Sequence, residues 1–198
     1  MSGCSCEVGS EGDRRALKVA LVLNTAMFVI GAVAGVLAQS TSLIADALDM
    51  LADASAYAIA LIAIGRTDRF KAVSAIASGV VLLALGAGVL IEVIHRMLYG
   101  STPESLVIIG VAALSLLVNT TVLRMLGRFR AGQVHLRAAW IFTRADVIAN
   151  IGVIASGILV ALTGKRYPDL VAGTAIGIYV IREAFEILSE ARESQPEP

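Results

Sequence analysis

Residues 19–45 read VALVLNTAMFVIGAVAGVLAQSTSLIA and contain no charged side chain. A membrane-spanning helix needs about 20 apolar residues, so this stretch holds one such helix and the start of a second. The break between the two is expected at residues 39–42, Gln-Ser-Thr-Ser, because serine and threonine hydroxyls cap the first turn of a helix. The stretch therefore predicts helices over residues 16–38 and 42–65.

The same alternation of apolar runs and short polar breaks continues to the end of the chain. It predicts four more helices, over 71–97, 105–126, 137–163 and 168–189, and Pro168 suits a first helical position. The connections are short, so consecutive helices should be antiparallel neighbours. We predict an all-α polytopic membrane protein with a six-helix transmembrane domain over 16–190, and polar tails over 1–15 and 191–198.

The composition agrees with this class and excludes others. The 198 residues are 57% hydrophobic and 16% charged, with a mean hydropathy of +0.81, whereas soluble domains carry about 25% charged residues. The formal net charge is zero, so no basic field favours nucleic acid as a partner. The cysteines are Cys4 and Cys6, so disulfides are not expected to hold the helices together.

The basic residues predict the orientation of the chain. If both termini lie on one side, that side collects most of the lysines and arginines of the tails and loops, and the other side holds Arg96, Lys165 and Arg166. Basic loops stay in the cytoplasm. We expect a multi-pass protein of the cell (inner) membrane, in contact with the lipid bilayer, with both termini cytoplasmic.

Carboxylates occur in the middle of these apolar helices, where a charge costs several kcal/mol and usually serves a function. Asp46, Asp49 and Asp53 are spaced i, i+3 and i+7, which places them on one helix face within a ~60° arc. In the fifth helix, Asp146 and Asn150 share a face. At a rise of about 1.5 Å per residue, Asp53 should lie level with Asp146, and Asp49 with Asn150.

Such a cluster predicts a cation site. Carboxylates in low dielectric need either a cation or protons, so binding one excludes the other, which is the basis of metal-for-proton exchange. Oxygen ligands suit divalent metals from the hard to the borderline range. We predict Asp49, Asp53 and Asp146 as metal ligands, with Asn150 assisting. Asp46 has two interpretations: a structural carboxylate near its helix N-terminus, or part of an outer vestibule.

Two segments carry a family resemblance. Residues 40–53, STSLIADALDMLAD, resemble the second helix of the cation diffusion facilitator family, which carries His/Asp-x-x-x-Asp after Ser-Leu and a further Asp. Residues 137–146, RAAWIFTRAD, resemble its fifth helix, which carries His-x-x-x-Asp. The resemblance covers about residues 16–190. It implies a divalent cation exporter that exchanges zinc, manganese, iron or cobalt for protons by alternating access.

The chain departs from the family pattern in two ways. The family's fourth ligand falls on Phe142, which cannot bind a metal, so Asn150 or water would complete the site. Loss of the imidazole shifts the site toward oxygen ligands and away from zinc. Many members also carry a cytoplasmic metal-sensing domain after the sixth helix, and we expect this chain to be a short form without it.

Other polar and small residues are expected to have structural roles or to face solvent. We expect Glu92 to pair with Arg96, and Asn24 and Asn119 to hydrogen-bond between helices. The small residues around Gly86 and Gly88 favour close packing, within the chain or in a homodimer. His95, His135 and the Cys4/Cys6 tail are weaker candidates for metal contact and are expected to be interfacial or solvated.

Two other functions stay open. Paired carboxylates also serve intramembrane acid–base enzymes, although the Gly-x-Gly-Asp motif of such proteases does not surround any candidate aspartate. A non-transporting membrane subunit is the second alternative. The residues favour a transporter, with no enzyme activity and no resident cofactor.

Overall fold

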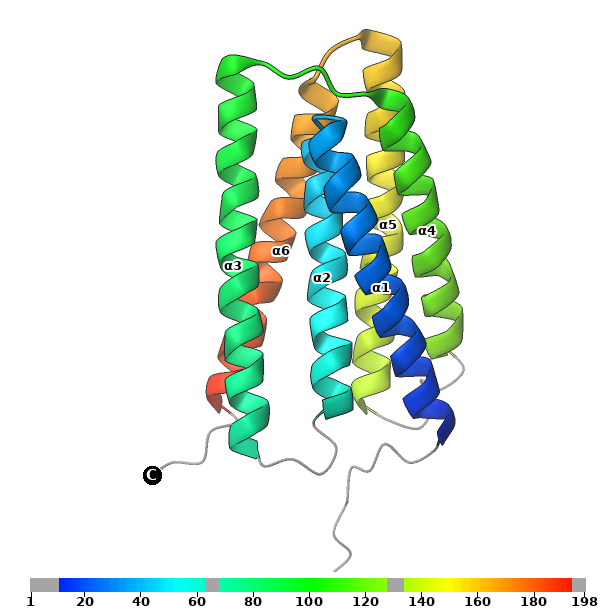
Figure 1. Ribbon diagram of the computed structural model, residues 1–198, viewed down its shortest axis with the longest axis vertical. Helices are drawn as coiled ribbons and strands as arrows, with labels where there is room; N and C mark the ends of the chain where they lie inside the picture. The colour runs from blue at the N-terminus through cyan, green and yellow to red at the C-terminus, as the bar shows by residue number, and fades with distance from the viewer. Residues whose placement is uncertain (1–10, 63–67, 128–133, 194–198) are drawn as a thin grey trace, which may run out of the picture.

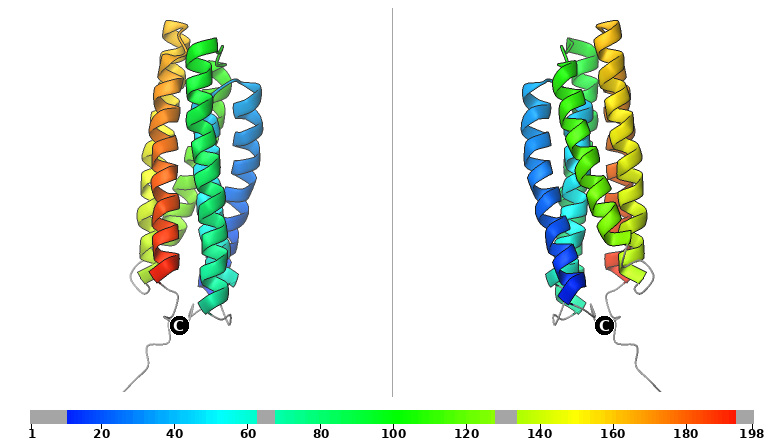
Figure 2. Two further views of the ribbon diagram at one scale, coloured as in Figure 1. Left: turned by 90° about the vertical axis from the view of Figure 1, so that its left-hand side faces the viewer. Right: turned by 90° about the vertical axis from the view of Figure 1, so that its right-hand side faces the viewer.

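The computed structural model describes residues 11–62, 68–127 and 134–193, and the backbone in these ranges forms six long helices and no strand. Consecutive helices run antiparallel, and residues 11 and 193 lie at the same end of the bundle (Figures 1 and 2). The predicted all-α, six-helix architecture is confirmed. The helices are α1 (Glu11–Leu37), α2 (Thr41–Ile62), α3 (Asp68–Tyr99), α4 (Ser105–Gly127), α5 (Val134–Thr163) and α6 (Tyr167–Glu193).

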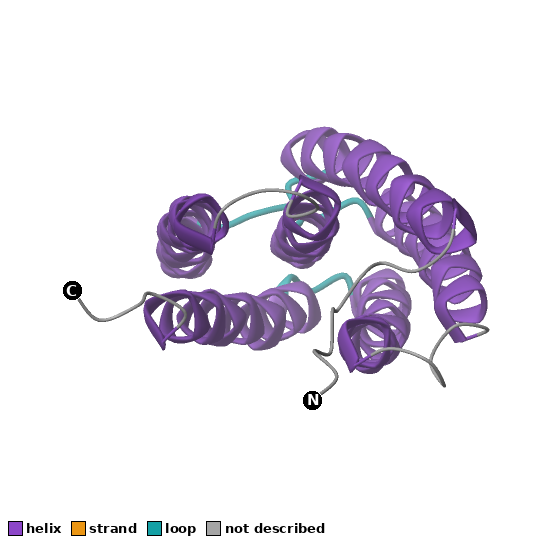
Figure 3. Cartoon of the chain, turned by 90° about the horizontal axis from the view of Figure 1, so that it is seen from below, coloured by secondary structure: helices purple, strands orange, loops and turns teal. Residues whose placement is uncertain are grey.

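Helix α2 is the central element of the bundle, because it packs against each of the other five helices. Figure 3 shows the bundle from below, with the helices seen close to end-on. The break predicted before α2 is confirmed: Gln39 takes a positive φ of 49°, and the Ser40 hydroxyl accepts a hydrogen bond from the Leu43 amide at 3.2 Å. The central position of α2 places its aspartates inside the protein.

The N-terminal end of α2 is tied to α6 by a buried carboxylate, which we call the Asp169 latch. Asp169 is fully buried, and its carboxylate accepts hydrogen bonds from the hydroxyls of Ser40, Thr41 and Ser42 at 2.5–2.7 Å. It also accepts the backbone amides of Thr41 at 2.7 Å and Ser42 at 3.2 Å. These amides are the ones that a helix N-terminus leaves without a partner, so Asp169 caps α2 from a different helix.

Glycines allow the helices to approach one another closely. A Cβ on Gly173 of α6 would meet the Thr41 carbonyl carbon at 2.8 Å, and a Cβ on Gly86 of α3 would meet Ile181 of α6 at 2.8 Å. A Cβ on Gly88 would meet no atom within 4 Å. The small residues predicted for close packing thus serve the α3–α6 contact at Gly86, whereas Gly88 faces open space.

The surface of the bundle is suited to lipid. Large apolar side chains of α1, including Val22, Val29 and Val33, are more than half exposed. Among the described residues, four helical stretches are long and apolar enough to cross a bilayer. They lie in α1, α3, α4 and α5, at Arg14–Leu37, Ala72–Tyr99, Ser105–Met125 and Ala145–Thr163. The predicted polytopic membrane protein is confirmed, and the charged residues of α2 are its three aspartates, Asp46, Asp49 and Asp53.

Candidate metal-binding site

The three aspartates of α2 point into the bundle as their spacing predicts. Asp46 and Asp49 are buried at 2% and 5% exposure, and Asp53 is partly buried. Their positions on one face follow from helical periodicity, since i, i+3 and i+7 share a side. The hydroxyl of Tyr57, one turn further along α2, donates a hydrogen bond to Asp53 at 3.4 Å. The aspartates are therefore held within the protein and do not face the lipid.

Asp146 of α5 meets this row of aspartates from the opposite side. It is 3% exposed, and the side chains of Asp49 and Asp53 both lie within hydrogen-bonding reach of it. The Oδ2 atom of Asp146 is buried and has no hydrogen-bond partner. A buried acceptor without a partner is costly. The predicted proximity of Asp49, Asp53 and Asp146 is thus present in the structure, and we call these three residues the central carboxylates.

The central carboxylates lack a basic partner within the described ranges. The ion pairs there lie elsewhere, between Glu92 and both His95 at 3.9 Å and Arg96 at 2.7 Å, and between Arg182 and Glu186 at 3.3 Å. In this conformation, no three His, Cys, Asp or Glu side chains of the described residues are arranged to hold a metal ion together. Ligation by the central carboxylates would therefore require their side chains to converge further.

Asn150 is not beside Asp49, as the depth estimate predicts, but beside Asp46. Its amide nitrogen donates to Asp46, and its carbonyl oxygen accepts a hydrogen bond from Asn119 of α4 at 3.1 Å. Ser115 of α4 donates to the second oxygen of Asp46 at 3.0 Å. Helix α5 begins at Val134, three residues before the predicted start at 137, so a count from its first residue places each α5 residue about 4.5 Å further along the helix.

The same hydrogen bonds surround the carboxylate of Asp46. The carboxylate is tied to α4 and α5 by Ser115 and Asn150, and the capping of α2 is done by Asp169. These buried hydrogen bonds agree with the structural interpretation of Asp46, although the amides at the start of α2 are capped by Asp169 and not by Asp46. The carbonyl of Asn150 has a second lone pair, which leaves it able to assist a cation.

A fourth acidic residue near the site is absent from the sequence predictions. Glu183 of α6 is partly buried and lies within hydrogen-bonding reach of Asp49 and of Tyr179, which precedes it by one helical turn. It sits near the inner end of the predicted sixth helix and directly follows Arg182, which suggests a solvated loop. The available signal was its i, i+4 spacing from Tyr179, because a tyrosine hydroxyl in an apolar helix needs a polar partner.

The remaining predictions have mixed outcomes. Glu92 pairs with Arg96 as expected, and His95 is exposed at the outer end of α3. Asn119 bonds between helices as expected, but the Asn24 amide donates to Ala20 of its own helix at 3.0 Å. The side chains of Phe142 and His135, and all of Cys4 and Cys6, lie outside the described residues.

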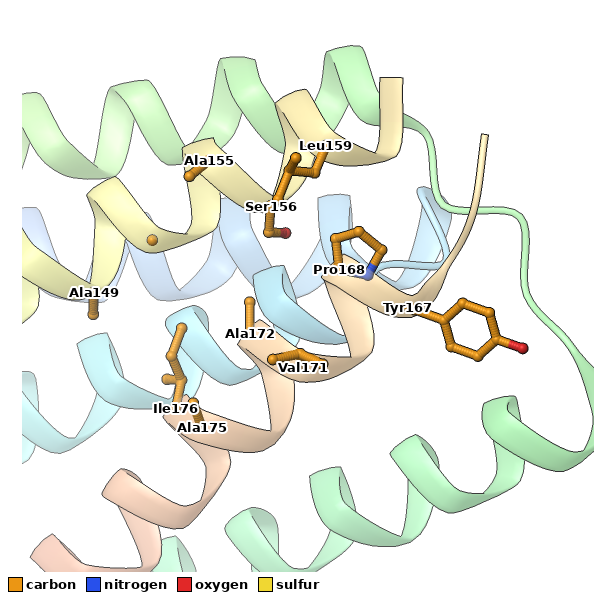
Figure 4. A pocket seen from close by; sticks show the side chains of 11 residues that line it. Ala149, Ala155, Ser156, Leu159, Tyr167, Pro168, Val171, Ala172, Ala175 and Ile176 are labelled. Carbon is orange, nitrogen blue, oxygen red and sulfur yellow. The ribbon is translucent and has the colours of Figure 1, made fainter. Parts of the chain in front are cut away.

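A cavity of about 560 Å³ lies between the C-terminal part of α5 and the N-terminal part of α6 (Figure 4). Its lining runs from Ala149 to Leu159 on α5 and from Tyr167 to Ile176 on α6, and it is almost wholly apolar. The hydroxyl of Ser156 has no hydrogen-bond partner. A dication would lose its hydration there without gaining ligands, so this cavity is not a candidate cation site.

Comparison with known proteins agrees with this geometry. The family described as cation efflux transmembrane domain matches residues 17–194. The metal cation efflux system protein CzcD of Cupriavidus metallidurans is 29% identical over 192 residues, covering 91% of this chain and 61% of that protein. The cadmium, cobalt and zinc/H(+)-K(+) antiporter of Bacillus subtilis is 24% identical, covering 90% of this chain and 62% of that protein.

A third relative is the zinc transporter ZitB of Pectobacterium atrosepticum, which is 24% identical, with 91% of this chain and 60% of that protein covered. The chain thus spans about three fifths of the length of the curated relatives it matches.

Proposed function

The chain belongs to the cation efflux transmembrane domain family, and from that premise we propose that it exports a divalent transition metal ion in exchange for protons. The metal is the transported substrate, and no resident cofactor is needed. The relatives support this substrate class, because they are a metal cation efflux protein, an antiporter of cadmium, cobalt and zinc with protons and potassium, and a zinc transporter.

One observation carries the proposal. Asp146 faces Asp49 and Asp53 from the opposite helix, with a buried oxygen that has no partner. Carboxylates that face each other in an apolar bundle are stable only with a cation or with protons between them. A site that accepts either one, but not both, couples the movement of metal to the movement of protons in the opposite direction.

In this proposal, Asp49, Asp53 and Asp146 bind the metal. Asn150 assists from the outer side, through the free lone pair of its carbonyl and through its hold on Asp46. The site alternates between the two faces of the membrane. Because all these ligands carry oxygen, manganese, iron and cobalt are proposed substrates beside zinc.

The orientation and the cell membrane location are part of the proposal. The end of the bundle that holds residues 11 and 193 carries the basic residues Arg14, Arg15 and Lys18, so it is placed in the cytoplasm by the positive-inside rule. Arg96 and Arg166 lie at the other end, where an Arg166 nitrogen donates to the Met97 carbonyl at 3.3 Å. Metal would then enter from the side of the termini.

The test is metal-driven proton flux in proteoliposomes that contain the purified chain. Manganese, iron, cobalt, nickel, zinc and cadmium are compared, with Asp53→Ala as the inactive variant and Glu186→Gln as a matched exposed control on α6. We expect flux with one or more metals, lost in Asp53→Ala and kept in Glu186→Gln. Absence of flux with every metal, from protein shown to be folded, would overturn the exchanger and favour a non-transporting subunit.

A further inference from the structure

We propose that Glu183 of α6 is a fourth carboxylate ligand of the transported metal. This inference rests on the proposed function, because it concerns the same site. With Glu183, three helices instead of two would supply ligands to the metal, and the number of carboxylate ligands would rise from three to four.

The geometry brings Glu183 to the central carboxylates. Its side chain lies within hydrogen-bonding reach of Asp49, and its charge acts on both Asp53 and Asp146. The Asp169 latch aligns the outer ends of α2 and α6. At about 1.5 Å per residue, Glu183 follows Asp169 by ~21 Å and Asp53 follows Thr41 by ~18 Å, so the two residues are nearly level.

The direction of side chains in a helix accounts for the remaining difference in depth between Glu183 and Asp49. In a helix, the Cα–Cβ bond tilts toward the N-terminus, which for α6 is the outer end, where Asp49 lies. The long side chain of Glu183 thus reaches outward to Asp49 from a backbone position slightly inward of Asp53. Tyr179 lies one turn outward on α6 within hydrogen-bonding reach of Glu183, and it acts as a positioning residue.

A second observation supports a ligand at this cluster, which can be a cation or a proton. Asp146 is 3% exposed, and its Oδ2 atom has no hydrogen-bond partner although it lies among other acidic groups. A carboxylate in a structural role is surrounded by donors, as Asp169 is. Glu183 brings a further carboxylate, which can only accept hydrogen bonds, close to Asp49. The neighbouring Arg182 does not neutralise it, because in the described residues Arg182 pairs with Glu186.

The sequence explains why a ligand from α6 would be useful. Phenylalanine at position 142 offers no lone pair, so α5 contributes Asp146 alone to the central carboxylates. A ligand from α6 would restore four protein ligands to the cation. An all-oxygen set of this kind favours hard and borderline dications such as Mn²⁺ over metals that prefer nitrogen or sulfur ligands.

The test measures binding of Mn²⁺, Co²⁺ and Zn²⁺ to the full chain in detergent by titration calorimetry. We expect Glu183→Gln to weaken Mn²⁺ binding at least about tenfold, the lower end of what loss of even an outer-shell partner costs. Glu186→Gln, on the exposed side of the same helix, should bind as the parent does. Glu183→Asp keeps the carboxylate and should bind between the two.

The absorption spectrum of bound Co²⁺ gives a second readout, because it reports the ligands of the ion. Glu183→Gln should change this spectrum, whereas a structural role would leave it as in the parent. Unchanged affinity and spectrum in a folded Glu183→Gln protein, beside loss of binding in Asp53→Asn, would overturn this inference alone. Absence of metal binding by the parent chain would overturn the proposed function and this inference with it. If Glu183→Gln does not fold, Glu183→Asp decides through the same two readouts.

Discussion

The bundle holds buried carboxylates in two regions that differ in what surrounds them. The Asp169 latch receives five hydrogen bonds from Ser40, Thr41 and Ser42. The central carboxylates face one another, and Asp146 has a buried oxygen with no partner. Both regions connect α2 to another helix, so burial alone does not distinguish them.

The difference lies in the donors. A buried charge surrounded by N–H and O–H groups is satisfied in the folded protein, and its removal leaves those donors without a partner. A group of acceptors that face one another is satisfied only when something positive arrives. We therefore expect the latch to stabilise the fold and the central carboxylates to bind the cation. Each prediction below tests one side of this comparison.

The largest expected effect is on transport, in Asp146→Asn. We expect metal-driven proton flux to fall about a hundredfold or to the level of empty liposomes, because a ligand that carries charge is lost. Thermal stability in detergent should be unchanged or higher, since one of several facing carboxylates becomes neutral. A marked fall in melting temperature, with flux kept, would place Asp146 with the structural carboxylates.

The opposite pattern is expected for Asp169→Ala. Five donors would lose their acceptor, and unsatisfied buried donors cost about 1–3 kcal/mol each before relaxation. We expect the free energy of unfolding to fall by roughly 3 kcal/mol or more, measured by thermal or denaturant unfolding in detergent. The metal affinity of the protein that remains folded should stay close to that of the parent. Full stability of this variant would contradict the structural role of the latch.

A smaller loss is expected from crowding beside the latch in Gly173→Ala. The added Cβ would meet the Thr41 carbonyl carbon at 2.8 Å and the Thr41 Cβ at 2.9 Å, so α2 and α6 would have to separate. Overpacking of this kind costs about 1–3 kcal/mol. Unfolding curves measure the loss, and Gly88→Ala, with open space around its Cβ, is the matched control. Equal stability of the two variants would show that the contact at Gly173 is not tight.

The smallest effect is expected at the boundary between the two regions, in Asp46→Asn. The carboxylate has two donors, Ser115 and Asn150, and an asparagine can keep one of these bonds and reverse the other. We expect stability to change by about 1 kcal/mol or less, and flux to stay within about threefold of the parent. Loss of flux comparable with that of Asp146→Asn would instead make Asp46 part of the transport site.

Much of this arrangement could be predicted from the residues. The charge-free run over 19–45, its break before α2 and the shared face of Asp49 and Asp53 depend on local periodicity, which the sequence contains in full. The meeting of α2 with Asp146 follows from antiparallel neighbours and similar depth. These steps need no knowledge of how far each helix extends beyond the others.

The register and the contributions of α6 could not be obtained in this way. The position of Asn150 depends on where α5 begins and on how it packs against α2, and the apolar run alone does not give either. Asp169 directly follows Pro168 and looks like a loop residue, and Glu183 follows Arg182 and looks solvated. Their roles appear only when α2 and α6 are side by side, because each interacts with residues far away in the sequence.

The three aspartates of α2 also have a consequence for how the protein is made. An aspartate at the centre of a helix raises the free energy of insertion through the translocon by about 2.5–3.5 kcal/mol, and α2 carries three of them. Helix α1 precedes α2 in the chain, whereas α6, which holds the N-terminal end of α2, follows it by more than 100 residues. During synthesis, α2 is therefore expected to depend on α1 as its early partner in the bilayer, because its contacts with α6 can form only much later.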